Sequence, residues 1–564
     1  SNSVTPCSLC AYPKQPSLPI AKYSDTPLTK KSLRENMGNN NFSPQTIHIP
    51  TLVVCMGCIF TAPLNHREQG VLISKEWALV SMLFICIWSL FEIWKNKKQT
   101  SHEDNIAKTF FLVGTLECII AFLQSVRLFA SYNPFFRFTG SFTNPSMLAI
   151  LLSVSMPIGL YYSKQSYGKT RVIWLTLTLL QAILLALSTS RTGILAAICS
   201  FLILFFKPAS TLEKLCKMNK KTILPMFIFL PLFAVLYLSK EDSTNGRILI
   251  WTNCIHMIMD KPLWGWGTNG FDANYMPYQA AYFVQHPNST FAALADNISH
   301  PFNEYLLIAV KYGIGGFVTM MLTLWVFAKQ LTKDVSKHKR LNTCIFVAIA
   351  ICALFSYPYR MPIIWVVSTY IACRIITIAH IHRMAKAAPL LLAIPALLIT
   401  STSNIREKWL WSSLMDNPHQ ELPEKILQQY HHLYGKLHTN SDFLYNYGSV
   451  LHQQGKHSIS NRILQKCTNT YNDYNVQMLI ADNYRQLGMK QEAISTFDYA
   501  RHMIPCRFLP LYYEMRTYEE SGNIKEAYRI AKEIIVKHVK VHNSASVKEI
   551  IKEAKILIET YENE

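Results

Sequence analysis

Long apolar runs separated by short polar segments fill the chain from residue 48 to residue 401. A helix needs about 20 mostly apolar residues to cross a bilayer, and it tolerates Pro and Gly where neighbouring helices re-satisfy the backbone. The pattern predicts about eleven transmembrane helices, some of them short, over residues 48–64, 77–94, 106–131, 144–163, 171–188, 193–206, 222–239, 303–328, 341–357, 361–378 and 387–401. The sequence therefore predicts an all-α, polytopic membrane domain over residues 48–401, with a long polar loop over residues 240–302.

Two segments of different character flank this domain. Residues 1–47 are rich in Ser, Pro, Asn and Lys, and they predict a mobile tail without the apolar stretch of a cleavable signal peptide. Residues 402–564 carry an internal repeat, in which Gly455, Gly488 and Gly522 lie 33 and 34 residues apart. This period, with small residues at helix crossings, resembles the tetratricopeptide repeat (TPR), in which helix pairs stack on one another. It predicts an α-solenoid that serves either as a helical stabiliser of the membrane domain or as a binding surface for an acceptor or a protein partner.

The charge distribution supports the membrane interpretation. Only 16% of the 564 residues are charged, compared with about 25% in soluble proteins, and the net charge is +20. Residues 402–564 hold 20 Lys and Arg against 19 Asp and Glu, which leaves 35 against 16 for residues 1–401. The basic excess therefore lies in the apolar part of the chain, which argues against a nucleic-acid-binding protein.

The basic residues also predict an orientation, because Lys and Arg mark the cytoplasmic loops of membrane proteins. They concentrate in the N-terminal tail and in the loops at 95–105, 207–221 and 329–340. These segments all share one side if the N-terminus is cytoplasmic. The turn at 190–192, the loop at 240–302 and the repeat segment then lie outside the cytoplasm.

Cysteine spacing carries little functional information. Most of the 14 cysteines lie in apolar runs, where a thiol acts as a small apolar residue. Cys7 and Cys10 form a CxxC pair without a second pair, which is a weak signal for zinc binding or redox chemistry. Cys467 and Cys506 could form a disulfide outside the cytoplasm, but spacing alone does not show that they come within reach.

Three polar clusters fall on the predicted outer face. Arg191 lies in the turn at 188–193 between two apolar helices, where a guanidinium and free backbone N–H groups suit either a phosphate or lipid headgroups. Residues 247–259 fit an amphipathic interfacial helix anchored by Trp251. His300 precedes a predicted helix start, where an imidazole either accepts a proton from a hydroxyl or caps the helix.

A glycine-rich segment follows the second cluster. Gly265, Gly267 and Gly270 have the spacing of a dinucleotide-binding loop, but they come after a helix instead of a strand. They therefore predict a tight turn in which one backbone approaches another.

Taken together, the clusters resemble the O-antigen ligase (Wzy_C) superfamily over about residues 171–330. The resemblance rests on the Ser190-Arg191-Thr192-Gly193 turn, on Gly246-Arg247 with the P-L-x-G-x-G that follows, and on H-P-x-N-E-Y-L at His300. A C-terminal tetratricopeptide domain is also similar to that of some members. The resemblance implies an inverting GT-C glycosyltransferase in the bacterial inner membrane, with a periplasmic repeat domain.

Such enzymes transfer a glycan from undecaprenyl pyrophosphate to a hydroxyl of lipid A-core or of a protein. Carried over by position, Arg191 and Arg247 would bind the pyrophosphate and take part in catalysis, and a His would activate the acceptor. No cofactor is implied, and no paired acidic motif is present, so we predict a metal-independent reaction. The predicted partners are the lipid-linked glycan, the acceptor, membrane lipid and a protein on the repeat domain, and no nucleic acid.

The sequence departs from the family pattern at the base. The pattern has a His directly before the Asn of the last helix, whereas here Phe302 precedes Asn303 and His300 lies two residues earlier. Two residues are about half a helical turn, so His300 need not point the same way. The base is therefore His300, His286 or Glu304, or it is absent, and Asn303 is a further site candidate.

Three other interpretations compete with a ligase. An O-antigen or exopolysaccharide polymerase would use a second lipid-linked glycan as its acceptor. A polysaccharide transporter would place its polar residues near the membrane midplane, whereas here they lie on one face. A membrane-anchored scaffold would leave Arg191 and Arg247 unexplained.

Overall fold

The structure is a computed structural model that describes residues 49–60, 68–95, 102–131, 133, 135–205, 241–416, 423–540 and 544–563. These residues form 21 α-helices and two short 3₁₀ helices and include no β-strand, which confirms the all-α prediction. The predicted tail, Cys7, Cys10 and the predicted helix at 222–239 lie outside the described residues. The following description concerns the compact unit Ile49–Glu564.

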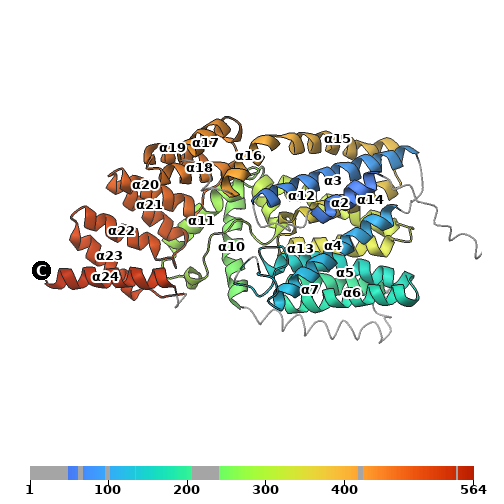
Figure 1. Ribbon diagram of the computed structural model, residues 1–564, viewed down its shortest axis with the longest axis horizontal. Helices are drawn as coiled ribbons and strands as arrows, with labels where there is room; N and C mark the ends of the chain where they lie inside the picture. Colours follow the sequence, from blue (N-terminus) through green and yellow to red (C-terminus); the bar gives the residue numbers. More distant parts are fainter. Residues whose placement is uncertain are drawn as a thin grey trace, which may run out of the picture. The chain divides into compact units, whose positions relative to one another are not determined.

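Ten helices correspond to predicted membrane segments and share one apolar core (Figure 1). They are α2 (Ile49–Phe60), α3 (Glu68–Lys95), α4 (His102–Ser125), α5 (Pro145–Gln165), α6 (Gly168–Leu187), α7 (Arg191–Phe205), α12 (Glu304–Lys333), α13 (Lys339–Phe355), α14 (Pro362–Ile378) and α15 (Arg383–Thr402). In the described part of the chain, six helices are long and apolar enough to cross a membrane: α3, α4, α5, α6, α12 and α15. Helices α7 and α14 are apolar but shorter. The structure thus confirms a multi-pass helical domain but does not confirm the count of eleven.

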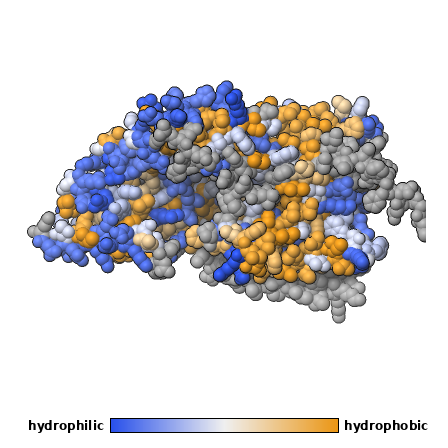
Figure 2. All heavy atoms as spheres, in the orientation of Figure 1, coloured by the Kyte–Doolittle hydropathy of each residue, from blue (hydrophilic) through white to orange (hydrophobic). Residues whose placement is uncertain are grey.

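The outer surface of this domain is apolar. Val172 and Leu179 on α6 are each 61% exposed, and Leu392 and Ile399 on α15 are 75% and 69% exposed. Figure 2 shows hydrophobic side chains over much of the face formed by these membrane helices and hydrophilic ones over the C-terminal helices. An apolar surface of this extent is typical of contact with lipid.

Helices α10 (Glu241–Asp260) and α11 (Gly270–Gln285) with the 3₁₀ helix η1 (Thr290–Ala293) form the predicted long loop. The helix predicted over 247–259 is present within α10. Its Cys254 and Met257 are fully buried against α11, whereas Met259 is 69% exposed. The loop is therefore a folded, two-helix layer.

The C-terminal segment is a series of consecutive helices, each packed on the next. They are α16 (Ile405–Asp416), α17 (Pro423–Leu437), α18 (Ser441–Gln453), α19 (His457–Thr468), α20 (Tyr474–Gln486), α21 (Lys490–Met503), α22 (Leu509–Glu520), α23 (Ile524–Val536) and α24 (Ala545–Asn563). Gly455, Gly488 and Gly522 adopt φ of 70°, 73° and 76°, each just after the first helix of a pair. A left-handed residue at this position ends a helix, and Gly adopts it without steric cost. The sequence repeat therefore coincides with a repeated helix–turn–helix pair.

Hydrogen bonds join the C-terminal helices to the long loop. The side-chain amide of Gln279 on α11 donates to the carbonyl of Met503 at 2.6 Å and to that of Asp296 at 3.1 Å. The amide of Asn297 donates to the Asp473 carboxylate at 2.5 Å. The C-terminal helices thereby hold the segment that leads to α12.

The two cysteines considered for a disulfide are apart and reduced. The thiol of Cys467 is buried and lies 3.4 Å from the carbonyl oxygen of Ser441. The thiol of Cys506 instead contacts the carbonyl oxygen of Ala295 in the long loop. Each thiol therefore packs at a different place and the suggested pairing does not form.

Candidate active site

Arg191 is the first residue of α7, and the turn before it fixes its position. Ser190 caps the helix, because its hydroxyl accepts a hydrogen bond from the backbone N–H of Gly193 at 3.4 Å. Gly193 packs directly on α5, where a Cβ would come within 2.9 Å of the Ala149 carbonyl oxygen. The Arg191 guanidinium then reaches across to α10, and its Nη1 donates to Thr244 Oγ1 at 3.4 Å.

Arg247 lies one helical turn beyond Thr244 and therefore on the same part of α10. Its guanidinium lies 5.4 Å from the centroid of the Phe302 ring. Burial and, next, the charge of Arg191 lower the pKa of Arg247. Two cations from different helices thus lie close together. Their mutual repulsion is relieved when an anion binds between them.

The glycine-rich turn packs against a break in α12, as predicted. At Gly313 the φ is 65° and the ψ is −165°, so the backbone is not helical there. The break exposes backbone groups that the turn satisfies: Trp266 N donates to Val310 O at 3.0 Å, and Ile314 N donates to Pro262 O at 2.7 Å. A Cβ on Gly313 would lie 2.3 Å from the Leu263 oxygen, so only Gly fits. This contact joins the segment after α10 to α12.

His300 lies in the loop before α12. Its ring centroid is 4.1 Å from that of Tyr357 and 4.5 Å from that of Phe302. Phe302 has a φ of 55°, a left-handed turn that is costly for a bulky residue. The Trp251 indole donates to the carbonyl of Pro301 at 2.9 Å and holds this loop against α10. His300 therefore lies next to the aromatic ring that contacts Arg247, although it precedes the family's usual position by two residues.

The His300 imidazole is neutral and poorly solvated. Its Nδ1 is buried and has no hydrogen-bond partner. Burial, followed by the charge of Arg360 and, more weakly, that of Arg247, lowers the pKa of His300 to about 4. A neutral ring nitrogen without a partner can accept a proton or a hydrogen bond from a ligand.

A cavity of about 200 Å³ opens beside His300. It is lined by side chains of both charges together with aromatic groups, among them Asp272, His300, Phe302, Asn303, Glu304, Lys311, Tyr357, Tyr359 and Arg360. Arg360 Nη2 donates to the Ser299 carbonyl at 2.7 Å, and Glu304 accepts from the Tyr359 backbone N–H at 3.3 Å. The turn between α13 and α14, which contains the short 3₁₀ helix η2 (Pro358–Arg360), thus closes the cavity from the other side.

The structure separates the predicted candidates. His300 and Glu304 line this cavity. Arg247 does not line it but lies against the ring of Phe302, which does, and Arg191 lies near Arg247. Asn303 is a helix cap, since its side chain accepts from the Leu306 backbone N–H at 3.0 Å.

His286 does not line the cavity. It ends α11, is exposed, and lies against Tyr282 with ring centroids 4.6 Å apart.

Arg360 is a site residue that the sequence motifs do not single out. It is a lone Arg in a turn between two apolar helices, α13 and α14, which is the same signal that identified Arg191. Lys311, to which the sequence assigns no role, lies 3.9 Å from the carboxylate of Asp272. Among the described residues, no group of three His, Cys, Asp or Glu side chains is arranged to hold a metal ion.

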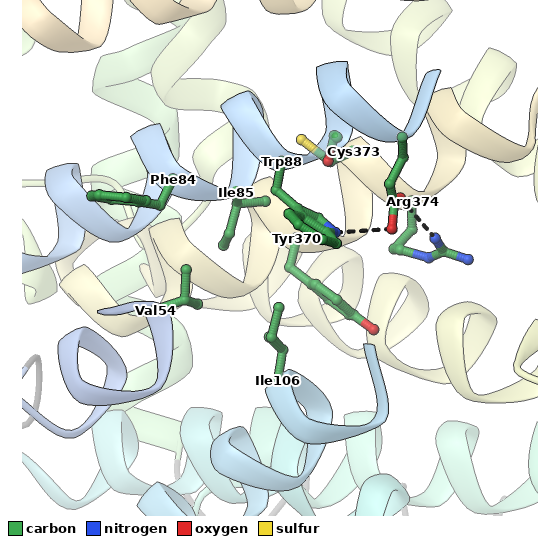
Figure 3. Close-up of a pocket in the computed structure, with 10 residues that line it drawn as sticks. Val54, Phe84, Ile85, Trp88, Ile106, Tyr370, Cys373 and Arg374 are labelled. Carbon is green, nitrogen blue, oxygen red and sulfur yellow. Dashed lines mark hydrogen bonds and ion pairs between the residues drawn. The ribbon is translucent and has the colours of Figure 1, made fainter. Parts of the chain in front are cut away.

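A second cavity lies between α3, α4 and α14 (Figure 3). Glu92 lies 3.8 Å from Arg374 Nη1 and accepts from the Trp88 indole at 2.9 Å. The space here is about 20 Å³, which is room for about one water molecule. This buried ion pair connects two helices and does not form a substrate site.

Residues 176–321 match the family model of the O-antigen ligase domain, Wzy_C. The match runs from α6 into α12 and contains Arg191, Arg247 and His300, whereas Arg360 lies beyond it. The fold and the match together define a multi-pass membrane protein with a domain of the O-antigen ligase kind. They support glycan transfer at a membrane in general, between a lipid-linked glycan and an acceptor. None of the curated proteins matches this chain.

Proposed function

We propose that this protein transfers a glycan from undecaprenyl pyrophosphate to an acceptor hydroxyl on the periplasmic face of the inner membrane. The observation that carries the proposal is the convergence of Arg191 and Arg247, from two different helices, beside the cavity that contains His300. A polymerase would use the same donor site and would differ only in its acceptor.

The proposed reaction needs charge neutralisation more than covalent chemistry. The acceptor oxygen attacks the anomeric carbon with inversion, the bond from that carbon to the pyrophosphate oxygen breaks, and the hydroxyl proton moves to the base. The leaving pyrophosphate gains negative charge, and the guanidinium groups of Arg191 and Arg247 stabilise it through paired N–H donors. This accounts for a reaction without a metal ion.

His300 is the best-placed base among the candidates. Its ring lines the cavity and its Nδ1 has no protein partner. Burial and the neighbouring cations keep the ring neutral but weakly basic. When pyrophosphate neutralises the neighbouring cations, the pKa rises towards the range in which a base works best. The donor would thus activate the base for its own transfer.

The C-terminal helices would form a periplasmic, tetratricopeptide-like domain that holds a macromolecular acceptor. Their contacts with Asp272, which lines the cavity, and with Asn297 would hold this domain near the cavity. Such an arrangement favours an acceptor that is itself a large molecule, such as a protein or lipid A-core.

The donor site is tested with Arg191→Ala and Arg247→Ala, assayed for transfer from undecaprenyl-pyrophosphate glycan at equal membrane levels. We expect each variant to lose about 10²-fold or more in kcat, as is usual when a preorganised donor to the leaving charge is removed. The matched control is Arg171→Ala. Arg171 is exposed and lies near the start of α6, whereas Arg191 follows the end of that helix. Full activity in both site variants would overturn the proposed role.

The acceptor is identified from the products of a deletion strain. Loss of polymer on lipid A indicates a ligase, and loss of a glycoprotein indicates protein glycosylation. Short glycan chains with intact attachment indicate a polymerase instead.

A further inference from the structure

Helix α10 and the turn after it leave an apolar stripe at the surface. Ile248, Ile255 and Met259 are exposed, and their spacing of seven and four residues places them on one face of the helix. The turn adds Leu263 and Trp264, which are 65% and 86% exposed. We call these five residues the α10 stripe. A run of large apolar side chains at the surface marks a place where a partner or a membrane makes contact.

The opposite face of α10 packs inside the protein. Cys254 and Met257 lie in the core that α10 shares with α11. Trp251, which the sequence predicts to anchor the helix at the membrane, is partly buried in the same core, and its indole donates to the carbonyl of Pro301. Trp251 therefore holds the loop before α12 in place. The exposed Trp264 has the position of a membrane anchor instead.

The stripe adjoins α12 near the point where that helix can enter the bilayer. Residues 314–333, beyond the break at Gly313, form a stretch of 20 residues, which is the length that crosses the hydrocarbon core. The backbone N–H of Ile314 donates to the carbonyl of Pro262 at 2.7 Å, directly before Leu263. Ile314 and Val318 are themselves exposed. The α10 stripe is therefore continuous with the apolar surface of α12 at the start of its span.

The character of the stripe and this continuity select lipid as the partner. His256, Asp260 and Lys261 are exposed beside the stripe, and an apolar stripe with polar flanks is typical of a helix that lies in the membrane interface. Trp is enriched at that level of the bilayer, since its ring is amphipathic. A protein docked on the stripe would meet the lipid around α12, because the two surfaces adjoin. The bilayer surface fits both surfaces at once.

We propose that the α10 stripe docks on the bilayer surface and thereby sets the depth of Arg247. Arg247 directly precedes Ile248, so the depth at which the stripe enters the interface fixes the level of the guanidinium. The ring of Phe302 and the nearby Arg191 mark where that guanidinium lies. The effect on Arg247 rests on the proposed function, because it takes the bound anion to be the pyrophosphate of a lipid-linked donor, which lies at the level of the headgroups.

The docking is tested by fluorescence of the full-length protein in nanodiscs of brominated lipid. The emission of Trp264 is the difference between the unmodified protein and Trp264→Phe. We expect lipid brominated near the headgroup to quench this emission more than lipid brominated at the chain ends. The matched control is Trp411→Phe, because Trp411 packs on Phe443 in the C-terminal helices, and its emission should stay unquenched. Emission of Trp264 that neither lipid quenches would mean that protein or solvent covers the stripe, and it would overturn the docking.

The effect on Arg247 is tested by binding of undecaprenyl pyrophosphate to the same nanodiscs. We expect Leu263→Ser combined with Trp264→Ser to raise Kd about tenfold, the factor that corresponds to the apolar contact of one Leu-sized side chain. The matched control combines Leu487→Ser with Met489→Ser, an exposed apolar pair at a turn of the C-terminal helices, and should keep Kd. An unchanged Kd in the first variant would overturn the effect on Arg247. If the unmodified protein does not bind the pyrophosphate, the proposed function is wrong, and the quenching still decides the docking.

Discussion

Replacing Arg360 by Gln removes a positive charge from the wall of the cavity that contains His300. The pKa of His300 is about 4 instead of the ordinary 6.5, because of burial first and the charge of Arg360 second. A general base works only in its neutral form, so transfer must decline as the pH falls through this pKa. The dependence of kcat/KM on pH reports the pKa values of groups in the free enzyme. We therefore expect its acid limb near pH 4 in the unmodified protein.

In Arg360→Gln, burial remains and one charge is lost. We expect the pKa of His300 to rise by about one unit, which is less than the full difference from the ordinary value. The acid limb of kcat/KM should move to higher pH by the same amount. In the unmodified protein, the acid limb of kcat should lie at a higher pH than that of kcat/KM, because bound pyrophosphate neutralises Arg247 as well.

Two results would refute this reasoning. An acid limb that does not move in Arg360→Gln would mean that the charge does not act on the titrating group. A limb that persists in His300→Gln would mean that another residue is the base. If His300 is the base, His300→Gln should lower kcat by about 10²- to 10⁴-fold and remove the limb. Membrane levels of each variant serve as the control for folding.

Three further predictions concern the framework. Gly313→Ala should abolish folded protein in the membrane, because its Cβ would collide with the Leu263 oxygen, whereas Gly315→Ala, whose nearest contact would be 3.6 Å, should accumulate normally. Gln279→Leu should lower the free energy of unfolding by about 1–3 kcal/mol, since the buried Met503 carbonyl and the Asp296 carbonyl lose their donor, as measured by thermal unfolding in detergent. Burial raises the pKa of Glu514 to about 8, so its folded form binds a proton that the unfolded chain has released, and stability should fall as the pH rises from about 4.5 to 8. Glu514→Gln should reduce this loss of stability by about 2–4 kcal/mol, as measured from melting curves at pH 5.5 and 8.5.

Most of the fold followed from local signals in the sequence. Length and hydropathy located ten of the predicted membrane segments, because an apolar run of about 20 residues is what a helix needs to cross the bilayer. The count could not be predicted in the same way, since α7 and α14 are apolar but shorter than a typical span. The internal repeat was visible because each unit needs a left-handed residue at the same turn, and Gly supplies it.

The candidate site was only partly predictable. Arg191 and Arg247 were identified because a lone cation between apolar segments is costly unless it binds something. Arg360 carries the same signal as Arg191 but was not singled out, and Asp272 gives a weaker one. Their proximity to His300 depends on how α11 and the turn between α13 and α14 fold back on the loop, and sequence spacing does not contain that information. Phe302 is a similar case, because residue spacing does not reveal the left-handed backbone conformation that it adopts between His300 and α12.

The packing of the C-terminal helices on α11 decides how their role can be studied. Tyr275 and Met276 on α11 are almost fully buried, in a core that they share with Phe497 and Met503 of α21. A truncation before α17 would expose this core and release the loop that carries His300. The resulting loss of activity would follow from the disturbed loop whether or not these helices bind an acceptor. Substitutions on exposed positions of the C-terminal helices, which leave this core intact, therefore separate acceptor binding from support of the active site.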